Sequence, residues 1–141
     1  MPAFQRSGDL FDAGYFCAES VLQSIAEARE IQSDLIPKIA TGFCSGVSRT
    51  CHMCGAVSGA IMCISMIYGR NTPDGSVENC YSRVRTLMAL FEDKFGSINC
   101  QELIGCDLGT EEGQHTYQSN NLRSQCREYT TEAVKIAMSL I

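Results

Sequence analysis

Nine cysteines in a chain of 141 residues are the side chains best suited to chemistry. Thiolates bind soft metals, attack disulfides, and cycle between dithiol and disulfide forms. The count is odd, and the opening MPAFQRSGDLFDAG has no apolar run with a basic flank, so we expect no export signal and no disulfide framework. The excess of cysteine therefore favours metal ligation, redox chemistry or burial, and the position of each cysteine decides between them.

Residues 50–60 read TCHMCGAVSGA and contain a CxxC motif, formed by Cys51 and Cys54. A CxxC pair at a helix start can carry dithiol chemistry, because one thiol has a lowered pKa and the other resolves the mixed disulfide. On this hypothesis Cys51 and Cys54 are the catalytic residues. The alternating strands and helices of thioredoxin-like proteins are absent from the pattern. His52 lies inside the motif and could bind metal, although a loop histidine is more often solvated.

Apolar residues recur at helical spacing along almost the whole chain, and no run alternates as a strand would. Helices are predicted over residues 16–31, 54–68, 77–95, 100–104 and 123–141, with weaker helical signals over 4–13 and 34–42. The segment 43–53 is expected to be a loop and 106–121 a partly irregular connection. The predicted fold is an all-α, single-domain helical bundle of about five or six helices spanning residues 1–141.

Four cysteines share one position, the first turn of a predicted helix: Cys17, Cys54, Cys100 and Cys126. Free N–H groups and the helix dipole favour a thiolate there. Helices joined by short connections alternate in direction, so the first, third and fifth begin at one end of the bundle. The long connection can return the last helix to that end, where the loop already holds Cys44 and Cys51. Up to six thiols are therefore predicted to converge.

Cys63 and Cys80 are expected to lie apart from this group of thiols. Cys63 is nine residues beyond Cys54, which places it about 13 Å away on the opposite face of one helix. Cys63 and Cys80 are therefore interpreted as buried packing residues, and Cys106 is left undecided. Gly55 and Gly59 have a GxxxG spacing, which predicts either close approach of a neighbouring helix or a homodimer face.

The chain resembles the family of redox-active proteins named for its C_GCAxxG_C_C pattern. The central motif stands here at residues 54–59 as CGAVSG, and GYFCAESVL, FGSINCQELIG and QCREYTTEAV are similar to the family's other three cysteine segments. The resemblance runs over nearly the whole chain. It implies that the family's cysteines are Cys17, Cys54, Cys100 and Cys126, in an electron carrier or a cluster-binding module. The family usually has a glycine-rich loop before this motif, whereas FCSGVSRTCHM adds Cys44 and Cys51.

Three functions are compatible with these cysteines. The first is an iron–sulfur or other metal cluster bound by the four family cysteines, with Cys51 or Cys44 as additional or exchangeable ligands. The second is the metal-free dithiol at the CxxC motif. The third is a structural zinc site, which also uses four thiolates. The first is favoured, and it predicts electron transfer to a redox partner protein rather than turnover of a small substrate.

Composition narrows the classes of partner. The net charge is −5, and no basic patch indicates nucleic-acid binding. No stretch approaches the roughly 20 apolar residues of a membrane-spanning helix. We therefore expect a cytoplasmic protein without a membrane span.

Overall fold

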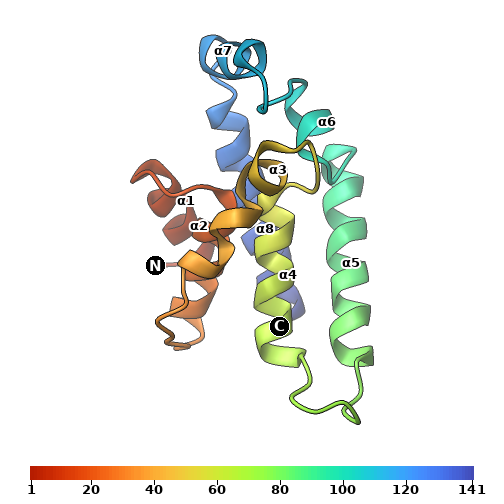
Figure 1. The fold of residues 1–141 in the computed structure, drawn as a ribbon. Helices are drawn as coiled ribbons and strands as arrows, with labels where there is room; N and C mark the ends of the chain where they lie inside the picture. Colours follow the sequence, from red (N-terminus) through yellow and green to blue (C-terminus); the bar gives the residue numbers. More distant parts are fainter.

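The computed structural model describes residues 1–141 as an all-helical bundle (Figure 1). Its elements are α1 (Ala3–Asp12), α2 (Cys17–Ala28), the 3₁₀ helix η1 (Lys38–Phe43), α3 (Cys44–Arg49), α4 (Gly55–Tyr68), α5 (Glu78–Phe95), α6 (Cys100–Ile104), α7 (Glu111–Ser119) and α8 (Arg123–Leu140). The predicted all-α class is confirmed. The predicted number of helices is too low, because the structure has eight α elements rather than five or six.

Helix α4 lies at the centre of the bundle. Its side chains are apolar or small on nearly every side, and residues 55–60 are all buried. Helices α2, α5 and α8 pack against it, and α1 packs against α2 and α8. Figure 1 shows α4 and α5 side by side, with α3, α6 and α7 gathered at the end where α4 begins. A helix without a polar face needs neighbours to cover it, and they do so over its first half, whereas Ser65 and Met66 near its end are exposed.

The two glycines of the GxxxG spacing bring α2 close to α4. A Cβ atom on Gly59 would lie 2.8 Å from Ala18 O and 3.1 Å from Val21 Cβ, both on α2. A Cβ atom on Gly55 would clash with Cys17 Sγ. The predicted close helix approach is confirmed. Both glycines are buried against α2 of the same chain, so they do not form an exposed dimer face.

Aromatic rings join α5, α6 and α8. Phe91 is fully buried, with its ring centroid 4.9 Å from Phe95 and 6.1 Å from Tyr129. The Tyr129 hydroxyl donates a hydrogen bond to Leu103 O at 3.0 Å. This contact attaches the short helix α6 to the long helix α8, so the cluster fixes the position of an element that carries a cysteine.

Two segments differ from the sequence prediction. The predicted helix over 34–42 is a turn followed by η1, and Pro37 accounts for the difference because proline disfavours the α conformation of the residue before it. The predicted irregular connection over 106–121 contains α7, whose N-cap Thr110 accepts a hydrogen bond from the Gly113 N–H at 2.9 Å. No helix combines the length and apolar character needed to cross a bilayer.

Candidate functional site

Four cysteines line one cavity of about 420 Å³ at the end of the bundle where α4 begins. They come from four elements: Cys17 opens α2, Cys54 precedes α4, Cys100 opens α6, and Cys126 lies in the second turn of α8. Of the up to six thiols predicted to converge, the structure brings these four to one cavity, whereas Cys44 and Cys51 do not line it. We call this space the cysteine cavity.

A backbone pairing brings Cys54 and Cys100 together. Met53 and Asn99 form an isolated antiparallel bridge. The Cys54 N–H donates to Ile98 O at 2.7 Å, and the Cys100 N–H donates to His52 O at 2.9 Å. These bonds connect the start of α4 to the start of α6, so two segments far apart in the sequence reach the cavity in a fixed relation.

Element α3, within the segment predicted as a loop, is a left-handed turn. Residues 45–49 have φ values from 57° to 67°, which is unfavourable for the β-branched Val47. Gly46 is required at its position, since a Cβ atom there would lie 2.6 Å from Cys100 Cβ. Hydrogen bonds hold the turn, with Ser48 Oγ donating to Gly42 O at 2.8 Å and the His52 N–H donating to Gly46 O at 2.9 Å. Strained backbone of this kind persists where its surroundings enforce it, often beside a functional site.

Cys17 is the thiol in the cavity that ionises most easily. A hydrogen bond from the Cys44 thiol is the main cause that lowers its pKa to about 7, and the N–H groups of Ser45 and Ala18 act in the same direction against burial. The pKa of Cys44 is raised, first by its hydrogen bond to Cys17 and then by burial. The Cys44 thiol has an alternative acceptor in Ala40 O, which lies 3.7 Å from its Sγ. Cys44 is only 4% exposed and is not among the residues that line the cavity.

The other three cavity thiols stay protonated at neutral pH. Burial raises the pKa of Cys54 well above its usual value, and negative charge on Cys17 raises it further. Burial likewise raises the pKa of Cys100 to about 12 and that of Cys126 to about 11. At these three positions burial outweighs any effect of the helix start, whereas at Cys17 the N–H groups of the helix start only add to the larger effect of the Cys44 thiol.

Polar side chains from α7 and the start of α8 form one wall of the cavity. Tyr117 donates a hydrogen bond to the Cys126 sulfur, and Arg123 packs over Phe11 at 4.2 Å and donates to Phe11 O. This wall is not predicted from the sequence, because Gly113 interrupts the helical pattern of α7. The signal that was available is Thr110 followed by two glutamates, a typical helix start.

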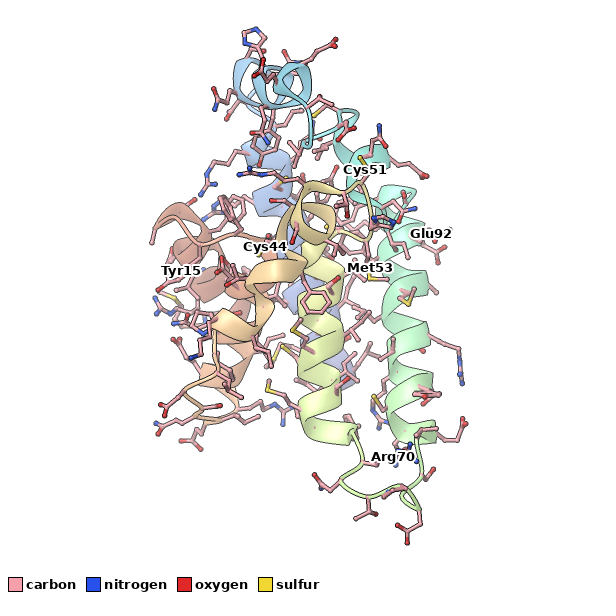
Figure 2. All side chains as sticks on the ribbon, in the orientation of Figure 1. Tyr15, Cys44, Cys51, Met53, Arg70 and Glu92 are labelled. Atoms are coloured by element: carbon pink, nitrogen blue, oxygen red, sulfur yellow. The ribbon has the colours of Figure 1, made fainter.

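The two cysteines of the CxxC motif lie in different surroundings. Cys54 lines the cavity, whereas the Cys51 thiol donates to the Asp107 carboxylate, and this bond raises the pKa of Cys51 and lowers that of Asp107. Cys106 lies near enough for its charge to affect Cys51. Figure 2 shows Cys51 on the side of α6 and Cys44 on the side of α2. The structure does not pair Cys51 with Cys54, and a catalytic role for the motif stays a prediction.

The remaining candidate residues lie away from the cavity. His52 is exposed, and its Nδ1 forms a hydrogen bond with Thr50 Oγ1 at 2.8 Å. Cys63 and Cys80 are buried, as expected for packing residues, with Cys63 Sγ 3.8 Å from Val21 O and Cys80 Sγ 3.7 Å from Ser65 Oγ. No group of three or more His, Cys, Asp or Glu side chains is arranged to hold a metal ion.

Comparisons with known proteins agree with the resemblance seen in the sequence. The family model described as "Putative redox-active protein (C_GCAxxG_C_C)" matches residues 15–140. A curated protein of Archaeoglobus fulgidus named "Uncharacterized protein" is 29% identical over 147 aligned residues, which cover 97% of this chain and 91% of the relative. No solved structure matches the chain. The matched region includes all four cysteines of the cavity.

Proposed function

Because the chain belongs to the redox-active protein family with the C_GCAxxG_C_C pattern, we propose that its cysteine cavity holds an iron–sulfur cluster and that the protein passes electrons to a redox partner protein. The observation that carries this proposal is the convergence of four thiols from four elements on one cavity. Four cysteine ligands are the usual requirement of two-iron and four-iron clusters. A bound cluster supplies one-electron redox chemistry that thiols alone do not.

The four thiols are the donor type that such a group uses, although no three of them are arranged to hold a single metal ion. The cavity is lined mostly by apolar side chains, and its volume of about 420 Å³ leaves room for a group of several atoms among the sulfurs. Thiolates are the form that binds metal, and a bound cation deprotonates a thiol even where burial opposes it. The high pKa values of Cys54, Cys100 and Cys126 are therefore compatible with ligation, provided that cations enter the cavity.

Residues around the cavity would hold and adjust the sulfur ligands. The Ser45 and Ala18 N–H groups donate to the Cys17 sulfur, the Ala56 N–H donates to Cys54, and the Tyr117 hydroxyl donates to Cys126. Hydrogen bonds to ligand sulfurs are one of the factors that set the reduction potential of a cluster. The left-handed turn and α7 would contribute in this way, and α7 would also separate the site from solvent.

Metal analysis of anaerobically purified protein tests the proposal. We expect iron and acid-labile sulfide, with visible absorption that bleaches on reduction. Cys54→Ser and Cys126→Ser should lose most of the iron, whereas Cys63→Ser is the matched control because Cys63 is buried outside the cavity. Circular dichroism should confirm that each variant is folded. Folded wild-type protein without iron or sulfide, even after anaerobic reconstitution, would overturn the proposal, and one zinc ion per chain would indicate the structural site instead.

A further inference from the structure

Cys44 is a fifth thiol that lies directly behind one of the four cavity cysteines. The two thiols are close enough for each to shift the pKa of the other. Gly55 gives a second, independent indication that the two residues lie close together. A Cβ atom added at Gly55 would clash with Cys17 Sγ and lie 3.2 Å from Cys44 Cα. The Cys17 sulfur and the Cys44 backbone therefore both lie against Gly55. Glycine at position 55 leaves room for the two cysteines to meet.

The two thiols differ in their access to the surroundings. Cys17 is partly exposed and lines the cysteine cavity, whereas Cys44 is buried and does not line it. An external reagent therefore reaches Cys17 first. Cys44 is then placed to react with whatever has formed on Cys17, which is the arrangement of an attacking thiol and a resolving thiol.

We propose that Cys17 and Cys44 form a reversible disulfide when the cysteine cavity is empty, and that this bond controls whether the cavity can be filled. The control rests on the proposed function, since Cys17 is one of the four sulfur ligands assigned to the cluster. A disulfide withdraws Cys17 from that set and leaves three thiols. The disulfide itself does not depend on any bound metal.

A low-molecular-mass disulfide, such as oxidised glutathione, is the class of oxidant that the reaction needs. The Cys17 thiolate attacks one sulfur of this disulfide, whose S–S bond breaks, and one thiolate leaves. The departing thiolate takes up a proton, and Cys44 then gives up its own proton and attacks the Cys17 sulfur. The mixed disulfide breaks and releases the second small thiol. Two electrons pass from the cysteine pair to the small disulfide, which ends as two thiols.

Cys17 and Cys44 lie where a disulfide between them would affect other residues of the cavity. Cys44 begins the left-handed turn α3, whose Ser45 N–H donates to Cys17. A covalent bond would attach this turn to the start of α2. The same turn contacts Cys100 through Gly46. The disulfide would therefore restrict Cys100, a second cavity cysteine, as well as removing Cys17 from the set of ligands.

The test uses the iron-containing protein and the same protein after its iron is removed with a chelator. Each is treated anaerobically with oxidised glutathione, and disulfides are mapped by differential alkylation and mass spectrometry. We expect stripped wild-type protein to lose two free thiols, found in a Cys17–Cys44 peptide, and iron-containing protein to keep both thiols. Cys63→Ser should behave as wild type.

Cys44→Ser is the decisive variant because it removes the resolving thiol. We expect it to bind as much iron as wild type and, when stripped, to accumulate a glutathione adduct on Cys17 instead of an internal disulfide. Iron-binding protein that forms no Cys17–Cys44 disulfide when stripped would overturn the inference and leave the proposed function intact. Protein that never binds iron but forms this disulfide would overturn the proposed function, and with it the control of cluster binding, while the disulfide itself would stand. If the protein kept its iron while the Cys17–Cys44 disulfide was present, the proposal that this disulfide controls filling of the cavity would be refuted.

Discussion

The ionisation of Cys17 can be tested by removing its hydrogen-bond donor. The pKa of about 7 for Cys17 depends first on the thiol of Cys44. At pH 7 such a thiol is about half ionised, whereas a cysteine with the ordinary pKa of about 8.5 is only about 3% ionised. Cys44→Ala removes the donor, and the N–H groups of Ser45 and Ala18 then act alone against burial. We expect the pKa of Cys17 to rise to the ordinary value or beyond it.

The suitable measurement is the midpoint of reactivity against pH rather than one rate. A pKa of about 7 gives roughly fifteenfold more thiolate at pH 7, but a less basic thiolate is also less nucleophilic, which reduces the advantage to about three- to fourfold. Iodoacetamide labelling of reduced, metal-free protein, followed by mass spectrometry of the Cys17 peptide, gives the midpoint directly.

Two outcomes would refute this reasoning. One is a wild-type midpoint for Cys17 at about 8.5 or above, which would mean that burial outweighs all the donors. The other is an unchanged midpoint in Cys44→Ala, which would mean that the thiol of Cys44 does not donate to Cys17. Cys44→Ser provides an internal check, because its hydroxyl can replace the lost donor and should restore part of the shift.

Three further predictions concern stability. Gly55→Ala forces a Cβ atom against Cys17 Sγ and should cost about 1–3 kcal/mol of unfolding free energy in urea denaturation, with reduced iron content; an unchanged value would contradict the close packing. Phe91→Ala should cost about 3–5 kcal/mol because the ring is fully buried, whereas Tyr81→Ala, at a side chain that is 53% exposed, should change stability by less than about 0.5 kcal/mol. Reduced, metal-free protein should lose stability between about pH 9 and 11, because Cys126 ionises first in the unfolded chain while its pKa is about 11 in the folded one. Denaturation of Cys126→Ala over that range should show a weaker dependence on pH.

The convergence of the four cysteines was predictable from the sequence because it depends on coarse features. Helical spacing gave the long helices, and short connections gave their alternating direction. These two facts place the starts of α2, α4 and α6 at one end of the bundle. The position of Cys126 is harder to predict, because it depends on how the chain returns through the segment 106–121, whose helix the sequence pattern does not reveal.

Local backbone geometry was not predictable in the same way. The left-handed turn at residues 45–49 is intrinsically unfavourable for its serine and valine residues. Local hydrogen bonds to Gly42 and from His52 hold it, and Gly46 packs against Cys100. That turn places Cys44 behind Cys17. Cys51 also has a positive φ of 65° and hydrogen-bonds Asp107. Sequence spacing makes Cys51 and Cys54 look like a pair, whereas the turn gives Cys17 its thiol partner from outside the motif.

The charges in the cavity limit what the four thiols can do without a metal. Cys17 can ionise near neutral pH, whereas burial, and then the negative charge on Cys17, raises the pKa of Cys54 and Cys126. Without metal, the cavity therefore holds at most one thiolate near neutral pH. Holding four thiolates would require positive charge among them, which iron ions supply. The same arrangement makes Cys17 the cavity thiol that ionises most easily, and Cys44 is the thiol that most affects its pKa. The proposed disulfide would therefore compete with metal for Cys17.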